Sequence, residues 1–240
     1  MIQLSFVTKL YNSNNFGLVI EELEIPTGEI VGVLGANGSG KTTFLKSVMG
    51  LGELKRGEVL IAGKPVMEQY HNIAFITEEG SYLSHLTPLM YGEFLSVFFP
   101  KFNMEKYIKL LKYFDINTKN KIRTFSKGQK SKVEICAGFS KGAKYILLDE
   151  PFLGKDMFTR QDFLKMMISI LRTDETILIS SHFVNEIENI IDRALIFERG
   201  RIQGDYYIDD LREEGKELSE VMKTISGYQE NKYQNAMKLI

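Results

Sequence analysis

"GANGSGKT", residues 35–42, is the stretch that decides the fold of this 240-residue chain. It follows the apolar run "IVGVLG" and leads into "TTFLKSVMG", so a predicted strand ends in it and a predicted helix begins from it. Gly35, Gly38 and Gly40 allow the backbone to turn tightly and to aim successive N–H groups at an anion. The N-terminal end of the helix adds positive potential at the same point. The stretch therefore predicts a phosphate-binding site.

The same residues match G-x-x-x-x-G-K-[ST], the pattern of the nucleotide-binding P-loop, and the strand and helix on either side are the context that this pattern requires. A glycine-rich turn with an exposed lysine is the alternative, and it leaves that context unexplained. In the P-loop pattern, Lys41 reaches the β- and γ-phosphates and the Thr42 hydroxyl binds Mg²⁺. The expected nucleotide contacts are Gly35, Ala36, Asn37, Gly38, Ser39, Gly40, Lys41, Thr42 and Thr43.

"YILLDEP", residues 145–151, supplies the expected carboxylates. Four apolar residues run into Asp149, which places its carboxylate at the C-terminal end of a strand, where open α/β sheets bind ligands. Asp149 can then hold Mg²⁺ through water, and Glu150 is the candidate to orient or deprotonate the attacking water. Acidic residues often follow strands for other reasons, so this pattern gains its meaning from the P-loop upstream.

The rest of the chain predicts an α/β fold of the P-loop NTPase type, with a largely parallel sheet flanked by helices. Short apolar runs typical of strands recur at 30–35, 59–63, 73–77, 145–149, 176–180 and 194–198. Residues 1–25 read as two strands and a turn, which predicts an N-terminal antiparallel β layer. Residues 80–142 predict a helical insertion. We expect one domain, with 1–79 and 143–226 as the core and 227–240 as a C-terminal tail.

Composition excludes several classes of protein. The chain is 44% hydrophobic and 25% charged with a net charge of −1, which is typical of a globular protein and offers no basic surface for nucleic acid. Its N-terminus lacks the basic and apolar segments of a signal peptide, and no apolar run approaches the ~18 residues needed to span a bilayer. The one cysteine, Cys136, cannot form an internal disulfide, and a packed position in a helix is the simplest expectation for it.

Further motifs give the chain a resemblance to a known family. "FSKGQ" (125–129) resembles the LSGGQ signature of ATP-binding cassette (ABC) transporters, and "ISSH" (179–182) resembles their switch-histidine segment. Tyr11 stands where the family has an adenine-stacking aromatic residue, and "FLGKD" (152–156) stands where it has a dimer-contact loop. The motifs occur in family order over roughly residues 2 to 210, so the chain looks like the nucleotide-binding subunit of such a transporter.

This resemblance implies an ATPase that works as a head-to-tail dimer with two ATP molecules at its interface. The chain carries one P-loop and one signature, so it needs a second cassette, identical or different. By resemblance, the signature contacts ATP bound by the other cassette, through Ser126, Lys127, Gly128 and Gln129. His182 bonds the γ-phosphate and holds Glu150, and Gly154 and Asp156 belong to the dimer-contact loop. Tyr11 stacks on adenine, although Phe16 can serve instead.

Three positions depart from the family pattern. Glu78 replaces a glutamine that touches Mg²⁺ and water; a carboxylate can still bind a hard cation, so Glu78 joins Thr42 and Asp149 as an expected metal ligand. Lys127 replaces a glycine that allows positive φ. Lys155 replaces an aliphatic residue of the dimer-contact loop.

Residues 81–100 are rich in apolar side chains, among them Tyr82, Leu83 and Phe94. One interpretation is that these apolar side chains pack within the helical insertion itself. By resemblance this region receives a short helix of the membrane-spanning subunit, so we expect docking near residues 80–95. We therefore expect a cytoplasmic, peripheral ATPase subunit that powers a separate membrane subunit, of the bacterial exporter type. The alternative is a soluble ABC-type ATPase that acts on DNA, on ribosomes or in regulation, but the chain lacks the coiled-coil insertion or second cassette expected of such relatives.

Overall fold

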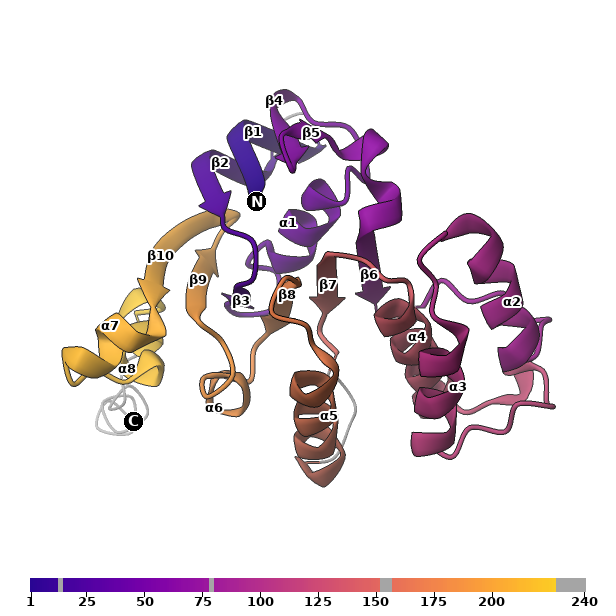
Figure 1. Cartoon of the computed structure of the whole chain (residues 1–240). Coiled ribbons are helices and arrows are strands. Elements are labelled where there is room, and N and C mark those ends of the chain that lie inside the picture. Colours follow the sequence, from indigo (N-terminus) through magenta and orange to yellow (C-terminus); the bar gives the residue numbers. More distant parts are fainter. Residues whose placement is uncertain (13–14, 78–79, 152–156, 228–240) are drawn as a thin grey trace, which may run out of the picture.

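The computed structural model describes residues 1–12, 15–77, 80–151 and 157–227, and places two β-sheets with helices around them (Figure 1). The smaller sheet has the strand order β2-β1-β4-β5 and is antiparallel throughout. Its strands are β1 (Ile2–Asn12), β2 (Asn15–Ile25), β4 (Arg56–Ile61) and β5 (Lys64–Pro65). This confirms the predicted N-terminal antiparallel layer. It also assigns the apolar run at 59–63 to this layer rather than to the parallel sheet.

The larger sheet has the order β10-β9-β3-β8-β7-β6. All neighbouring pairs are parallel except β9 with β10, which form a hairpin. The strands are β3 (Ile30–Leu34), β6 (Ile73–Thr77), β7 (Tyr145–Asp149), β8 (Thr176–Ser181), β9 (Arg193–Glu198) and β10 (Arg201–Tyr207). The carboxyl ends of β3, β6, β7 and β8 meet at one edge, and the P-loop, Asp149 and His182 follow from that edge.

Both faces of the parallel sheet are buried, which explains why its strands are almost wholly apolar. Side chains alternate between the faces: Leu147 and Leu178 pack with the antiparallel layer, whereas Ile146 and Ile177 pack with the helices on the other side. Helix α1 (Lys41–Val48) lies between the two sheets and buries Phe44, Leu45 and Val48 there.

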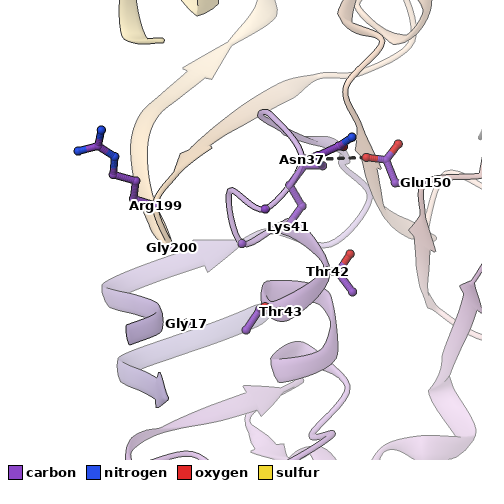
Figure 2. A pocket seen from close by; sticks show the side chains of 10 residues that line it. Gly17, Asn37, Lys41, Thr42, Thr43, Glu150, Arg199 and Gly200 are labelled. Atoms are coloured by element: carbon purple, nitrogen blue, oxygen red, sulfur yellow. Dashed lines mark ion pairs between the residues drawn. The ribbon is translucent and has the colours of Figure 1, made fainter. Parts of the chain in front are cut away.

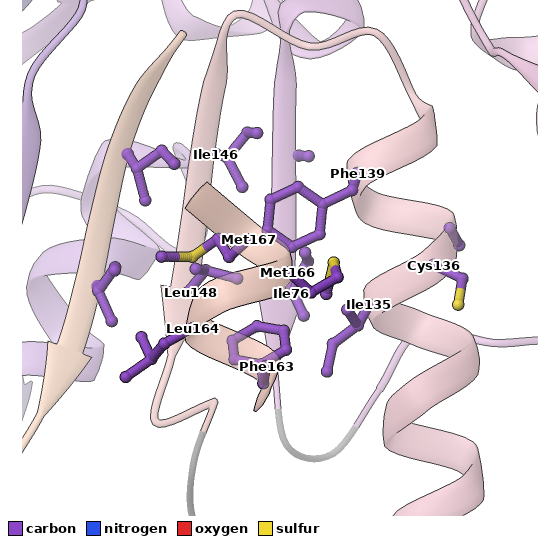
Figure 3. Packing of buried hydrophobic residues seen from close by; sticks show 14 of the residues in the cluster. Ile76, Ile135, Cys136, Phe139, Ile146, Leu148, Phe163, Leu164, Met166 and Met167 are labelled. Atoms are coloured by element: carbon purple, nitrogen blue, oxygen red, sulfur yellow. The ribbon is translucent and has the colours of Figure 1, made fainter. Parts of the chain in front are cut away.

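The opposite face is covered by α4 (Lys127–Ser140) and α5 (Met157–Ile170). Figure 3 shows Phe139 of α4 and Phe163 of α5 packed over Ile146 and Leu148. Cys136 is buried in this layer as expected, and burial raises the pKa of its thiol, so it stays protonated.

The remaining short elements are the 3₁₀ turns η1 (Val66–Glu68), η2 (Tyr70–Asn72) and η3 (Ile122–Thr124), with helices α6 (Val184–Ile187), α7 (Ile208–Glu213) and α8 (Leu218–Ile225).

Between β6 and β7 the chain is helical, as the sequence indicates. Helices α2 (Pro88–Phe98) and α3 (Met104–Tyr113) stand to one side of the sheet, and α4 joins them to it (Figure 1). Thr87 and Asn103 cap the N-termini of α2 and α3 with their side-chain oxygens. In the part of the chain that the structure describes, no helix is both long and apolar enough to cross a membrane.

Candidate nucleotide-binding and catalytic site

The P-loop is the turn between β3 and α1, and its conformation needs glycine. Gly35, Gly38 and Gly40 have φ of 146°, 79° and 114°. At Gly35 a Cβ atom would lie 2.4 Å from the carbonyl oxygen of Phe197, so a larger residue does not fit. Helix α1 begins at Lys41 with no side-chain cap at Gly40, which leaves its first N–H groups pointing toward a ligand site.

Lys41 is 5% exposed and lies across this loop. Its ammonium donates to the carbonyl oxygens of Gly35 (2.8 Å) and Ala36 (3.2 Å). It also lies 3.2 Å from the Glu150 carboxylate, an ion pair that Figure 2 shows. The one buried cation of the loop is thus directed at the carboxylate predicted to act on water.

Asp149 ends β7 and accepts two hydroxyl hydrogen bonds. The Thr42 hydroxyl donates to its Oδ1 over 2.9 Å, and Ser180 of β8 donates to the same atom over 2.8 Å. The two predicted magnesium ligands, 107 positions apart in sequence, therefore lie in direct contact. Ser180 holds Asp149 in place, a role that the sequence reading had not assigned to any residue of "ISSH".

Contacts with Lys41, Ser180 and His182 hold Glu150 in place. Its backbone has φ of 47°, a left-handed conformation that is uncommon for a residue with a side chain, and its N–H donates to the Ser180 hydroxyl over 2.8 Å. His182 Nδ1 lies 3.0 Å from Glu150 Oε2. Because an ionised carboxylate can only accept, Nδ1 carries the proton in this bond. The contact between His182 and Glu150 that the resemblance implies is present in the geometry.

These residues open onto a cavity of about 390 Å³ (Figure 2). Its lining includes Asn37, Thr43 and Glu150, and also Gly17, Arg199 and Gly200, which the sequence reading missed. Gly200 donates its N–H to Ser39 O and accepts from the Val19 N–H, both over 2.8 Å. No local motif marks Gly17 or the 199–200 turn, because tertiary packing alone brings them to the P-loop. The Arg199 side chain is directed away from Lys41, toward solvent (Figure 2).

The signature residues lie elsewhere, at the start of α4. Ser126, Lys127, Gly128 and Gln129 are all exposed. Ser126 caps the helix: its Oγ accepts from Gln129 N–H (3.2 Å), and Gln129 Oε1 accepts from Ser126 N–H (3.0 Å). Lys127 is the first helical residue and has no positive φ, so glycine is not required at this position.

Five predicted sites fall outside what the structure describes. Glu78, Gly154 and Asp156 lie outside the described residues, and so do the side chains of Tyr11 and Phe16, although their backbones belong to β1 and β2. Their roles stay predictions. Within the described residues, no group of three His, Cys, Asp or Glu side chains is placed to hold a metal ion. The Asp149 carboxylate and the Thr42 hydroxyl are two hard oxygen donors that lie in contact at the site.

Comparison with known proteins tests the family that the sequence resembles. A family model described as "ABC transporter" matches residues 21–153, more than half of the chain. The ABC transporter ATP-binding protein YtrB of Bacillus subtilis (strain 168) is 31% identical over 218 residues, which cover 89% of this chain and 74% of YtrB. The lipopolysaccharide export system ATP-binding protein LptB of Haemophilus influenzae is 32% identical over 194 residues, which cover 75% of this chain and 80% of LptB.

Solved structures show the same fold. An ATP-binding subunit of an ABC transporter superposes with a TM-score of 0.83 at 25% identity, over 94% of this chain and 99% of that one. A dimeric ATP-binding cassette bound to ADP and Pi after hydrolysis superposes with a TM-score of 0.77 over 87% and 99%, and at 22% identity it supports the fold alone. The chain therefore belongs to the ABC transporter family, as an ATP-binding subunit with the family's ATPase domain.

Proposed function

We propose that this chain binds ATP with Mg²⁺ in the cavity beside the P-loop and hydrolyses it to drive a separate membrane-spanning subunit. The observation that carries the proposal is the convergence of Lys41, Thr42, Asp149, Glu150 and His182 at the carboxyl ends of three neighbouring strands. This edge of the sheet is where an open α/β fold binds ligands.

Thr42 and Asp149 would hold the magnesium ion. Their oxygen atoms are 2.9 Å apart, and both are hard donors, the type that Mg²⁺ prefers. Mg²⁺ keeps several waters and shares phosphate oxygens, so two protein donors are enough. When bound, the ion neutralises charge on the transferring phosphate. Glu78 stays a predicted third ligand.

Hydrolysis would rest on two groups that contact each other. Lys41 and the P-loop N–H groups stabilise negative charge on the phosphates. Glu150 orients the attacking water and accepts its proton, while His182 fixes the carboxylate and Ser180 holds the Glu150 backbone N–H. Since Lys41 pairs with Glu150 at 3.2 Å, a phosphate that attracts the ammonium leaves the carboxylate available for water.

A second cassette would complete the site. Ser126 and Gly128 are exposed at the N-terminus of α4, where a hydroxyl, N–H groups and the helix dipole all favour a phosphate. By family resemblance this phosphate is the γ-phosphate of ATP bound by the other chain. Two solved structures with the same fold are titled as dimers of an ATP-binding cassette, which supports pairing of two cassettes.

The membrane subunit would dock on helix α2. This helix buries Tyr91 and Leu95 in the core, yet it also exposes apolar side chains on its other side. The exposed residues are Met90 (49%), Phe94 (40%), Val97 (77%) and Phe98 (62%), spaced as one helical face. We call them the α2 stripe. Tyr82 and Leu83, two of the apolar residues that the sequence places near the expected docking region, are instead partly buried against the insertion's core. Co-purification with the membrane subunit tests this surface.

The exporter type stays a prediction about direction. The relatives named for transport include a lipopolysaccharide export system at 32% identity and a manganese transport system at 24%. Transport measured in vesicles that contain the chain and its membrane subunit tests the direction.

Glu150→Gln tests the catalytic assignment. The amide keeps the shape of the side chain but cannot accept a proton, so we expect ATP turnover to fall by roughly 100-fold or more while ATP binding persists. Magnesium-dependent ATP hydrolysis and ATP-dependent dimerisation measured by light scattering give the two readouts. Glu105→Gln, the same change at a fully exposed site on α3, is the matched control. Turnover at the wild-type rate in Glu150→Gln would overturn the assignment.

A further inference from the structure

Glu134 is a buried carboxylate that the site described above does not use. It lies in α4 and is 1% exposed. The Ser81 hydroxyl donates to its Oε1 over 2.5 Å, and the Tyr91 hydroxyl donates to its Oε2 over 3.5 Å. A buried carboxylate is costly unless such bonds satisfy it, and an apolar residue of similar volume would avoid this cost. Because an apolar residue would fill the same space at less cost, we attribute the role of Glu134 to its hydrogen bonds rather than to packing.

Glu134, Ser81 and Tyr91 come from three segments that differ in their position relative to the ATP site. Glu134 lies two helical turns after the exposed signature residues on α4. Ser81 lies shortly after Thr77, where β6 ends at the edge of the sheet that carries the nucleotide cavity. Tyr91 lies on the buried side of α2, opposite the α2 stripe. Glu134 thus joins the signature helix to the strand end and to the proposed docking helix.

A second contact fixes α4 to the same strand. Gly138 packs so closely on β6 that a Cβ atom there would lie 2.3 Å from the Ile76 side chain. Helix α4 thus contacts β6 at Gly138, and it contacts Ser81, which follows β6, at Glu134. Burial and the Glu134 charge both raise the pKa of Tyr91, so its phenol stays protonated and able to donate to Glu134.

We propose that Glu134 is a positioning residue for ATP hydrolysis: through Ser81 it ties the signature helix to the end of β6, so that the two move together. This rests on the proposed function, in which the signature contacts ATP on a second cassette. Ser126 and Gly128 then take their closing position only together with Gly80 and Ser81, since the Gly80 N–H donates to Thr77 at the end of β6. The Tyr91 bond extends the same tie to α2.

Ser81→Ala is the direct test, because Ser81 is an exposed residue whose removal leaves the core packed. We expect kcat for ATP to fall about threefold to tenfold, which is the range for residues that couple two sites, with the KM for ATP and the thermal unfolding midpoint unchanged. In a Glu150→Gln background, the same substitution should raise the ATP concentration needed for dimerisation by a similar factor. Glu134→Gln keeps the acceptor oxygen and should retain most of the wild-type rate, whereas Glu134→Ala should not.

Ser140→Ala is the matched control. It also removes one hydroxyl from a hydrogen bond of α4, but Ser140 donates to Cys136 O within the helix, whereas Ser81 donates to α4 from outside it. Equal rates in Ser81→Ala and Ser140→Ala would overturn the positioning role while leaving the proposed function intact. If the Glu150→Gln chain with no other change does not bind ATP, the proposed function fails and this inference fails with it.

Discussion

The two surfaces that would hold one ATP molecule are built in different ways. On the P-loop side the key side chains are buried, with Lys41 5% and Asp149 9% exposed, and the bond between Thr42 and Asp149 joins segments 107 positions apart. On the helical insertion, the signature residues are exposed and the capping bonds of Ser126 reach only three residues along the chain. The first surface is a product of the tertiary fold, and the second is the start of one helix.

This difference separates two functions. The P-loop side gathers Lys41, Thr42 and Asp149 from one chain, so we expect a single cassette to bind nucleotide there. The signature side exposes a hydroxyl and N–H groups at the start of α4, which we expect to meet a phosphate bound by another chain. Substitutions on the two sides should therefore fail at different steps, and three variants test that expectation.

Gly35→Ala should have the largest effect. It places a methyl group 2.4 Å from Phe197 O at a φ of 146°, so we expect ATP binding to be lost and the free energy of unfolding to fall by about 3 kcal/mol. Thermal unfolding and titration with a fluorescent ATP analogue measure both effects. Gly63→Ala is the control, because its φ of 73° is also left-handed but the added methyl group meets no atom within 4 Å. ATP binding by Gly35→Ala as strong as that of the control would contradict the packing argument.

Ser126→Asp should stop hydrolysis without affecting binding to one chain. Aspartate caps a helix as well as serine does, but it has no proton to donate and would repel a phosphate. We expect wild-type ATP affinity for the monomer, unchanged helicity and a loss of turnover of about 100-fold, similar to removal of one donor to a developing negative charge. Circular dichroism, equilibrium binding and steady-state hydrolysis separate these outcomes. A fall in monomer affinity would show that the two surfaces are not independent.

Val97→Glu should have the smallest effect on the isolated chain. Val97 is 77% exposed on the α2 stripe, so the charge should leave stability, ATP binding and basal hydrolysis unchanged. Co-purification with the membrane subunit should fall at least tenfold, because a buried unpaired carboxylate opposes docking. Met67→Glu, at a residue 79% exposed beside the antiparallel sheet, is the control. If both variants retain the partner equally, the α2 stripe is not the docking surface.

The features that could be predicted from the sequence are those that depend on a few contiguous residues. "GANGSGKT" and "YILLDEP" each carry a strand and the loop that follows it, so the α/β class, the P-loop and the edge position of Asp149 followed from local pattern. The capping box of "SKGQ" is equally local. Apolar content alone could not tell which side of α2 faces solvent: Phe94 is exposed on the α2 stripe, whereas Tyr82 and Leu83 are partly buried.

Other features depended on packing between distant segments. Gly17 and the turn at Arg199 reach the cavity only because β2 and the β9–β10 hairpin lie beside the P-loop. Ser180 acquires its role because β8 lies next to β7 in register, with Asp149 paired to Ser180. The parallel strand order is not written in any short motif, so these contacts required the three-dimensional structure.

The contacts of Gly200 restrict where the protein can change shape. Its backbone bonds join the P-loop to β2, and a Cβ atom at Gly40 or Gly200 would meet the opposing backbone at 3.0 Å or less. Backbone held this closely to backbone, with no side chains between, leaves little room for hinge motion. The antiparallel layer, the hairpin and the P-loop should therefore behave as one rigid body in every nucleotide state. Opening and closing are then left to the junction with the helical insertion, which makes that junction the place to attach probes of domain rotation.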